Sequence, residues 1–451
     1  MSVLSNKLAV KYFKKRVISW LAVLTVAVSV FITLVVMTVM NGLAEEFKEK
    51  NHRLFGDCII SSSSLVGFAH YERLMTELAG QDFVEVMSPV ILSSGLISLE
   101  GGSRGEGVDI TGIDPESFCK VTEFADTLYE GSISSPADIF VNPEGGNEPG
   151  CVRGISMMAR RGSNGQYPSK LAYSLKIDVS CFPLTAGGTL AKGGTDLANT
   201  KSFVVANDSN AGLPRIDESM LYVPFNEAQL LCGMGGAEPR ISAVFIKFKP
   251  DTNLNRNVAA VRDIFDSFKA SMKGEAYADL LEKVTVQSWK QYRREDIAPI
   301  EKEGIMLMAM FVLIGVVTVF VILVVFYLII SHKSRDIGLF KSVGVSTFSV
   351  MGVFLRFAAI VGITGASVGT LSGCLFLLCI NDIENWLYVN YGWQLWDRSM
   401  YSIGEIPNDI QFPVAASIAV LAVIASLAGA VIPVMMASLR RPVDTLRVTQ
   451  V

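Results

Sequence analysis

Four long uncharged stretches divide this chain of 451 residues. Each is 24 to 28 residues long, and about 20 apolar residues suffice for a helix to cross the core of a bilayer. The first is separated from the second by 264 residues, whereas the last three follow one another closely. This spacing predicts a membrane protein with four transmembrane α-helices in a one-plus-three arrangement and a large domain between helices 1 and 2. The stretches are Val17–Met40, Ile305–Ile330, Phe357–Ile380 and Phe412–Leu439.

The charges between these stretches predict an orientation. Residues 1–16 carry five basic residues and no acid, and basic residues also dominate 331–356 and the tail 440–451. Residues 381–411 carry five acids against one arginine. Because basic segments stay in the cytoplasm, both termini and loop 331–356 are expected there. The inserted segment 41–304 and loop 381–411 are then extracytoplasmic. We expect the first stretch to remain as an anchor, because it exceeds the apolar core of a signal peptide and lacks a small-residue cleavage site.

The inserted segment predicts an α+β domain with its own core. Alternating apolar residues predict strands, and a period of 3.6 predicts helices. Residues 131–200 are rich in Gly-Gly pairs and prolines and predict long loops or an irregular insertion. The expected strands are Cys58–Ser62, Val84–Leu99, Gly107–Gly112, Ser202–Ala206, Met220–Pro224 and Ile241–Phe248. The expected helices are Tyr71–Ala79, Asn226–Cys232 and Asn255–Met272, with Ala44–Leu54 continuing the first transmembrane helix.

Five of the seven cysteines fall in the inserted segment, and an odd number cannot all pair within one chain. The count allows one or two disulfides and does not say which cysteines pair. The three histidines have no metal-ligand spacing, so no metal site is expected. The net charge of -4 gives no reason to expect nucleic-acid binding.

Several chemistries are missing from the sequence. No G-x-x-x-x-G-K-[ST] loop is present, nor any H-E-x-x-H or G-x-S-x-G motif, so we expect no ATPase or hydrolase activity in this chain. None of the four stretches contains an Asp, Glu, Lys, Arg or His, which argues against an ion-driven transporter. The charged run Arg293–Asp296 could form a site, but a solvated helix face is the more frequent outcome for mixed charges. Energy for any transport must then come from a partner.

The cytoplasmic loop 331–356 predicts a short amphipathic helix. Ile337, Phe340 and Val343 or Gly344 recur at helical spacing among basic residues. Gly344 suits a helix C-cap, and Ser346 or Thr347 suits the N-cap of the next helix. The pattern leaves two interpretations open, a helix that docks on a partner and a helix that rests on lipid headgroups.

Small residues at every fourth position mark helix packing in the third stretch. Gly362, Gly365, Gly369 and Gly373 belong to this series, and small residues at this spacing let helices approach closely. The fourth stretch repeats the pattern at Ala425 and Gly429, so the third and fourth helices are expected to pack on each other.

Methionines mark the outer ends of the first and second stretches, at Met37, Met40, Met306 and Met310. Methionine is flexible and fits irregular apolar partners. These side chains either face lipid in the ordinary way or line a cleft that accepts acyl chains.

Five segments together resemble the LolC/LolE permeases, within the wider MacB/FtsX-type group of ABC transporter permeases. The resemblance covers nearly the full chain, but residues 131–200 follow the family pattern poorly. The coupling-helix and tail segments are shared by the wider group, and the other three favour the Lol branch. The five segments are Val39–Phe47 (VMNGLAEEF), Gly112–Glu116 (GIDPE), Leu221–Gln229 (LYVPFNEAQ), Asp336–Gly344 (DIGLFKSVG) and Ala437–Arg447 (ASLRRPVDTLR).

The resemblance implies a bacterial inner-membrane subunit whose partners are a cytoplasmic ABC ATPase dimer, which holds ATP and Mg²⁺, and a second copy or paralogous permease. It implies that the subunit extracts lipoproteins from the outer leaflet by mechanotransmission and passes them to a periplasmic carrier. Membrane lipids are also implied as partners. MacB-like efflux and FtsX-like control of a cell-wall hydrolase are the alternatives, and a tethered enzyme is the least favoured. The implied coupling-helix residues are Asp336, Ile337, Gly338, Leu339, Phe340, Lys341, Val343 and Gly344.

Overall fold

The computed structural model describes residues 17–99, 105–129, 135–143, 145–158, 175–192, 197–236, 238–332, 342, 344–393 and 405–439. The chain divides into two compact units. Among the described residues, the membrane unit contains the chain up to Glu45, residues 299–396 and the chain from Glu405, and the external unit contains Glu46–Ala298. Both boundaries fall inside a helix, so the chain passes between the units without a loop.

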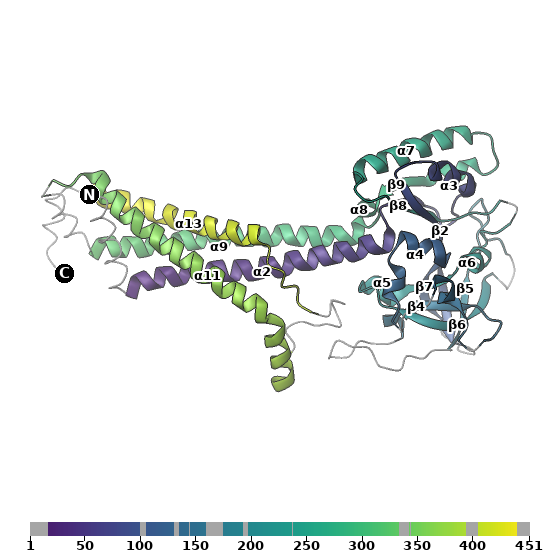
Figure 1. Cartoon of the computed structure of the whole chain (residues 1–451), viewed down its shortest axis with the longest axis horizontal. Helices are drawn as coiled ribbons and strands as arrows, with labels where there is room; N and C mark the ends of the chain where they lie inside the picture. The colour runs from purple at the N-terminus through teal and green to yellow at the C-terminus, as the bar shows by residue number, and fades with distance from the viewer. Residues whose placement is uncertain are drawn as a thin grey trace. The chain divides into compact units, whose positions relative to one another are not determined.

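The membrane unit is built on four long helices (Figure 1). Each contains one of the uncharged stretches and is long and apolar enough to cross a membrane. The one-plus-three arrangement of transmembrane helices is therefore confirmed. The fourth helix begins and ends with its apolar stretch, whereas the third runs eleven residues past Ile380 into the segment 381–411. The helices are α2 (Val17–Phe55), α9 (Arg294–His332), α11 (Thr347–Tyr391) and α13 (Phe412–Leu439).

The external unit is an α+β domain, as expected. Within its described residues lies one nine-stranded sheet, in the order β3-β7-β4-β6-β5-β2-β8-β1-β9. The strands are β1 (Cys58–Ser62), β2 (Val84–Leu99), β3 (Glu106–Ile113), β4 (Gly150–Gly154), β5 (Lys176–Cys181), β6 (Asn199–Ser209), β7 (Met220–Pro224), β8 (Ala243–Phe248) and β9 (Val284–Ser288).

The long strand β2 joins two parts of this sheet. Its first half, Val84–Val90, pairs with β8, which continues through β1 to β9. Its second half pairs with β3 on one side and with β5 on the other. Because β3 and β5 are also connected through β7, β4 and β6, these six strands close into a ring.

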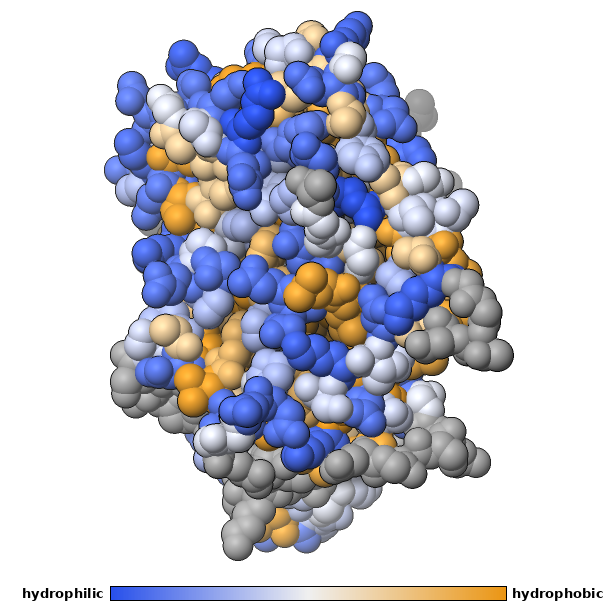
Figure 2. Space-filling model, turned by 90° about the vertical axis from the view of Figure 1, so that its right-hand side faces the viewer, coloured by the Kyte–Doolittle hydropathy of each residue, from blue (hydrophilic) through white to orange (hydrophobic). Residues whose placement is uncertain are grey.

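Short helices cover the sheet and create a core on each of its faces. In β1, Cys58 and Ile60 point into one core and Ile59 into the other, as the alternation of a strand requires. Helix α7 buries Val261, Phe265 and Phe268 in the first of these cores. The helices are α3 (Tyr71–Ala79), α4 (Pro115–Val121), α5 (Pro214–Ser219), α6 (Phe225–Leu231), α7 (Leu254–Ser271) and α8 (Trp289–Tyr292). The face in Figure 2 is mostly hydrophilic, with small apolar patches.

The expected strands and helices all exist, within a few residues of their predicted ends. The prediction of long loops or an irregular insertion for residues 131–200 missed two strands, because β4 and β5 lie there. Each is only five or six residues long and lies close to glycines or prolines. Their hydrogen bonds go to β6, β7 and β2, so pairing with distant strands makes them strands, rather than local sequence.

Candidate functional site

Two helices from the membrane enter the external domain through neighbouring strands. Only Gly56 and Asp57 separate the end of α2 from β1, and β9 is followed directly by α8 and then by α9. Strands β1 and β9 are antiparallel partners, with Cys58 opposite Ser288. We call the residues that fix this region the helix junction: Asn51, His52, Phe55, Asp57, Trp289 and Arg293, all of which belong to the external unit.

The turn between α2 and β1 has little freedom. Gly56 has a φ of 68°, the left-handed region that favours glycine. A Cβ atom there would lie 2.9 Å from Cγ1 of Val121 and 3.0 Å from the carbonyl oxygen of Ile246. A larger residue at Gly56 would therefore be strained in both backbone and packing.

Asp57 ties the helix to the sheet with both carboxylate oxygens. Its Oδ1 lies 2.8 Å from Nε2 of His52 in the last turn of α2, and its Oδ2 accepts a hydrogen bond of 2.7 Å from the backbone N–H of Phe248 in β8. The His52 ring stacks on the indole of Trp289, with ring centroids 4.8 Å apart. One side chain thus bridges α2, β8 and, through His52, the segment that starts α8.

Arg293, which directly precedes α9, contacts the last turns of α2. Its Nε donates to Oδ1 of Asn51 at 2.9 Å, and its guanidinium lies over the Phe55 ring, 4.7 Å from the centroid. Its Nη2 pairs with Asp296 at 2.8 Å. Burial lowers the pKa of Arg293, chiefly through desolvation, although an arginine remains cationic at any ordinary pH.

The charged run at Arg293–Asp296 is therefore only partly a solvated helix face. Arg294 and Glu295 are exposed, but the side chains of Arg293 and Asp296 are only 14% and 19% exposed. The prediction of a solvated face was wrong for these two residues. The run gives no sign of this, because the partners Asn51 and Phe55 lie more than 230 residues earlier in the sequence.

A buried carboxyl lies beside the junction. Asp217 in α5 is fully buried and accepts a hydrogen bond of 2.7 Å from the N–H of Ala211 through Oδ1, while Oδ2 has no hydrogen-bond partner. Desolvation raises the pKa of Asp217 to about 7, against the opposing effect of backbone N–H groups and of Lys50 in α2. Burial raises the pKa of Tyr222, and the negative charge of Asp217 adds to this rise.

The glycines of the third transmembrane helix lie at helix contacts. Gly365, Gly369 and Gly373 of α11 meet α2: a Cβ at Gly369 would lie 2.5 Å from the carbonyl oxygen of Ala27. Gly362 meets α13, where Ser426 donates to the carbonyl of Ala358 at 3.0 Å. The small-residue face thus has two partners, α2 and α13, where the sequence suggested α13 alone.

The glycine of the fourth transmembrane helix has a different partner again. A Cβ at Gly429 would lie 2.7 Å from the carbonyl oxygen of Val319 in α9. Next to Val319 in α9, Thr318 donates to the Ser29 hydroxyl of α2 at 3.1 Å. Close approaches and two polar contacts therefore connect the four helices.

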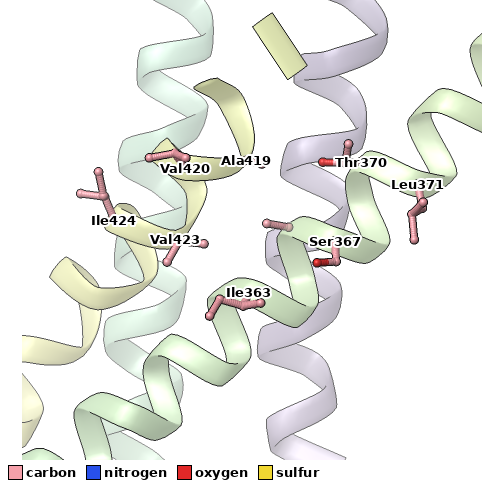
Figure 3. A pocket seen from close by; sticks show the side chains of 9 residues that line it. Ile363, Ser367, Thr370, Leu371, Ala419, Val420, Val423 and Ile424 are labelled. Atoms are coloured by element: carbon pink, nitrogen blue, oxygen red, sulfur yellow. The ribbon is translucent and has the colours of Figure 1, made fainter. Parts of the chain in front are cut away.

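An open groove of about 570 Å³ lies between α11 and α13 (Figure 3). Its walls are apolar apart from Ser367 and Thr370 of α11. The other lining residues are Ile363, Ala366, Leu371, Ala419, Val420, Val423 and Ile424. This groove was not predicted, because its lining residues are of the types found throughout membrane helices.

The methionines predicted at the outer helix ends do not line this groove. Met306 and Met310 of α9 are 73% and 44% exposed, and Met37 and Met40 of α2 are half-buried. The structure neither joins these four residues in a common cleft nor assigns them a ligand. Their role in contacting acyl chains stays a prediction.

The predicted coupling helix lies almost entirely outside the described residues. Asp336, Ile337, Gly338, Leu339, Phe340, Lys341 and Val343 belong to the part that the structure does not describe. Gly344 is described and has a φ of 90°. Ser346 caps α11 by accepting from the N–H of Ser349 at 3.3 Å, so the predicted start of that helix is confirmed.

Comparison with known proteins identifies the membrane part. Residues 308–442 match the family described as FtsX-like permease C-terminal. The chain is 21% identical to the lipoprotein-releasing system transmembrane protein LolC of Neisseria meningitidis, over 95% of this chain and 94% of that protein. The LolC of Xylella fastidiosa is also 21% identical, with the same coverage.

One solved structure aligns with about half of the chain. The periplasmic region of MacB from Actinobacillus actinomycetemcomitans aligns with a TM-score of 0.30 and 13% identity, over 54% of this chain and 95% of that one. The family match and the full-length relatives, together with the four membrane helices, make this chain a permease subunit of an ABC transporter in the bacterial inner membrane. The chain is thus similar to LolC over nearly its full length and to the FtsX-like permeases over residues 308–442.

Proposed function

We propose that this permease extracts lipoproteins from the outer leaflet of the inner membrane, using ATP hydrolysed by a partner subunit. The helix junction carries the proposal. Because α2 and α9 enter adjacent strands with no flexible linker, a movement of either helix would be passed to the sheet rather than absorbed in a loop. The cargo is suggested by the relatives, which are named for lipoprotein release and match over 95% of this chain.

The proposed source of energy is a cytoplasmic ABC ATPase dimer that binds ATP and Mg²⁺. In this proposal it pushes on Asp336–Gly344, with both termini of the permease on the same side. The chain acts beside a second copy or a paralogous permease. Replacing Phe340 by Asp should abolish ATP-driven release without affecting membrane insertion, and full activity in that variant would refute the docking role.

The acyl chains of the cargo are proposed to meet the outer ends of α2 and α9 at Met37, Met40, Met306 and Met310. A photo-crosslinking residue at Met306 should capture an acylated protein, and the same probe at Ile363 in the α11–α13 groove serves as the matched position. Capture at Ile363 alone would move the acyl site to the groove. Capture of phospholipid alone at Met306 would mean ordinary contact with the bilayer.

The test of the proposed function is reconstitution of the intact chain with its ATPase and companion permease in vesicles that contain a tri-acylated lipoprotein. ATP should release the lipoprotein to a soluble acceptor, and vesicles without ATP are the control. Export of a soluble peptide instead would indicate MacB-like efflux. ATP hydrolysis that moves no cargo but activates a cell-wall hydrolase would indicate signalling.

A further inference from the structure

We propose that Cys181 and Cys232 form a disulfide in the mature protein and that Cys58, Cys119 and Cys151 stay as thiols. The Sγ atoms of Cys181, at the end of β5, and Cys232, directly after α6, lie 3.6 Å apart. A disulfide needs about 2.0 Å, and small rotations of the two side chains cover the difference of roughly 1.5 Å. Both belong to the extracytoplasmic domain, where disulfides persist.

The backbone around the two cysteines is fixed on both sides. Cys181 is paired with Asn199 across β5 and β6, and the Asn199 side chain donates to the carbonyl of Leu231, next to Cys232, at 2.9 Å. Strand β2 holds the other side of β5, with Gly95 opposite Cys181. The two cysteines are thus held at their distance by the sheet rather than by their own contact.

Arg240 fixes the segments that follow each cysteine. Arg240 as a whole is 6% exposed. Its guanidinium donates to the carbonyls of Leu184 at 2.9 Å, Gly233 at 2.6 Å and Val66 at 2.9 Å. The chain after Cys181 and the chain after Cys232 therefore converge on one side chain. A covalent bond here would complete a connection that hydrogen bonds already make.

The surroundings of Cys181 favour thiolate chemistry. Hydrogen bonding with Cys232, 3.6 Å away, and with the Ser93 hydroxyl, 3.4 Å away, lowers the pKa of Cys181 against the effect of burial. Burial raises the pKa of Cys58 to about 12 and of Cys119 to about 11, and it also raises the pKa of Cys151. A thiolate is the nucleophile in disulfide exchange, so Cys181 is the first to react.

The oxidant in this reaction is a disulfide-containing donor of the extracytoplasmic compartment. The Cys181 thiolate attacks the donor's disulfide and forms a mixed disulfide, and Cys232, after losing its proton, attacks the Cys181 sulfur and releases the donor as a dithiol. Two protein thiols are oxidised and one donor disulfide is reduced. Because Cys181 and Cys232 are 1% and 4% exposed in the folded domain, the exchange takes place late in folding, when Cys181 already lies beside Cys232 and Ser93 but the donor can still reach it.

The test uses the intact protein from the membrane, with free thiols blocked by N-ethylmaleimide before lysis and again after unfolding. Mass spectrometry of a non-reduced digest should recover one peptide pair that joins Cys181 to Cys232, with Cys58, Cys119 and Cys151 alkylated. Recovery of both Cys181 and Cys232 as alkylated thiols, or of either one joined to another cysteine, would overturn the proposal. This readout needs no variant.

A second measurement follows stability. A reductant should lower the apparent Tm of the intact wild-type protein in detergent, and Cys232→Ser should remove that response. The matched control is Cys119→Ser, which should keep it. An identical Tm with and without reductant in the wild type would contradict the disulfide.

Discussion

Arg293 Nε donates a hydrogen bond to Asn51 Oδ1 across 2.9 Å, although 242 residues separate the two along the chain. Asn51 lies in the last turns of α2, and Arg293 immediately precedes α9. The bond therefore joins the segments through which both membrane helices enter the external domain. Because Asn51 is itself fully buried, loss of Arg293 would leave Oδ1 of Asn51 without this donor, while its amide nitrogen still donates to the carbonyl of Phe47.

The buried ion pair between Arg153 and Asp208 predicts a large loss of stability when one partner is removed. Arg153 of β4 and Asp208 of β6 are 2% and 0% exposed and are joined at 2.5 Å. Asp208→Ala leaves an uncompensated buried charge and should cost about 3–5 kcal/mol of unfolding free energy. Thermal unfolding of the intact protein in detergent measures this.

The control for that pair is the double variant Arg153→Met with Asp208→Leu. Replacing both charges by apolar side chains removes the unpaired charge, so much of the lost stability should return. A single Asp208→Ala variant as stable as wild type would show that water or another group compensates Arg153.

Asp217 predicts that the external domain loses stability as the pH rises from about 4 to about 7. The pKa of Asp217 is raised to about 7 in the folded domain from 3.8, so folding takes up a proton in this window. The free energy of unfolding then falls with rising pH, by roughly 4 kcal/mol at most, and is level above about pH 7. The positive charge of Lys50 lowers the pKa of Asp217 in part, and the charge of Asp217 adds to the effect of burial in raising the pKa of Tyr222.

Apparent Tm values from pH 5 to pH 8 check this prediction. Asp217→Asn should flatten the slope, whereas Asp263→Asn, at an exposed position of α7, should preserve it. A wild-type slope that survives in Asp217→Asn would assign the titration to another group.

The close approach of α11 to α2 at Gly369 predicts that a large side chain there destabilises the membrane unit. A Leu side chain there would clash with the backbone of Ala27, because even a Cβ would lie 2.5 Å from its carbonyl oxygen. Gly369→Leu should lower the apparent Tm and the monodisperse fraction in size-exclusion chromatography. Gly352→Leu in the same helix should behave as wild type, since a Cβ there has nothing within 4 Å.

Local pattern predicted the transmembrane helices and most of the external strands. The 24-residue run Val17–Met40 and the alternation in Val84–Leu99 each contain enough signal within one segment to specify an element. Strands β4, β5 and β9 and helices α4 and α5 are five to seven residues long and were not predicted. They form because distant strands offer hydrogen-bond partners and burial, which a window on the sequence does not contain.

The helix junction could not be predicted for the same reason. His52 and Trp289 stack, and Asn51 meets Arg293, only because β1 and β9 are neighbours in the sheet. The sequence suggested one disulfide or two among five cysteines, and the pairing of β5 with β6 singles out Cys181 and Cys232. By contrast, Ser346 was predicted as an N-cap because its partner Ser349 lies three residues away.

The most direct test of force transmission through the helix junction is the amount of lipoprotein released per ATP hydrolysed by the reconstituted complex. Arg293→Ala removes the hydrogen bond to Asn51 and the contact with Phe55, whereas Arg294→Ala changes an exposed neighbour by the same chemistry. We expect Arg293→Ala to hydrolyse ATP at the wild-type rate and release at least about tenfold less lipoprotein, a loss equivalent to about 1.4 kcal/mol of coupling. Arg294→Ala should match wild type in both. Equal release per ATP in Arg293→Ala, Arg294→Ala and wild type would contradict transmission through the junction.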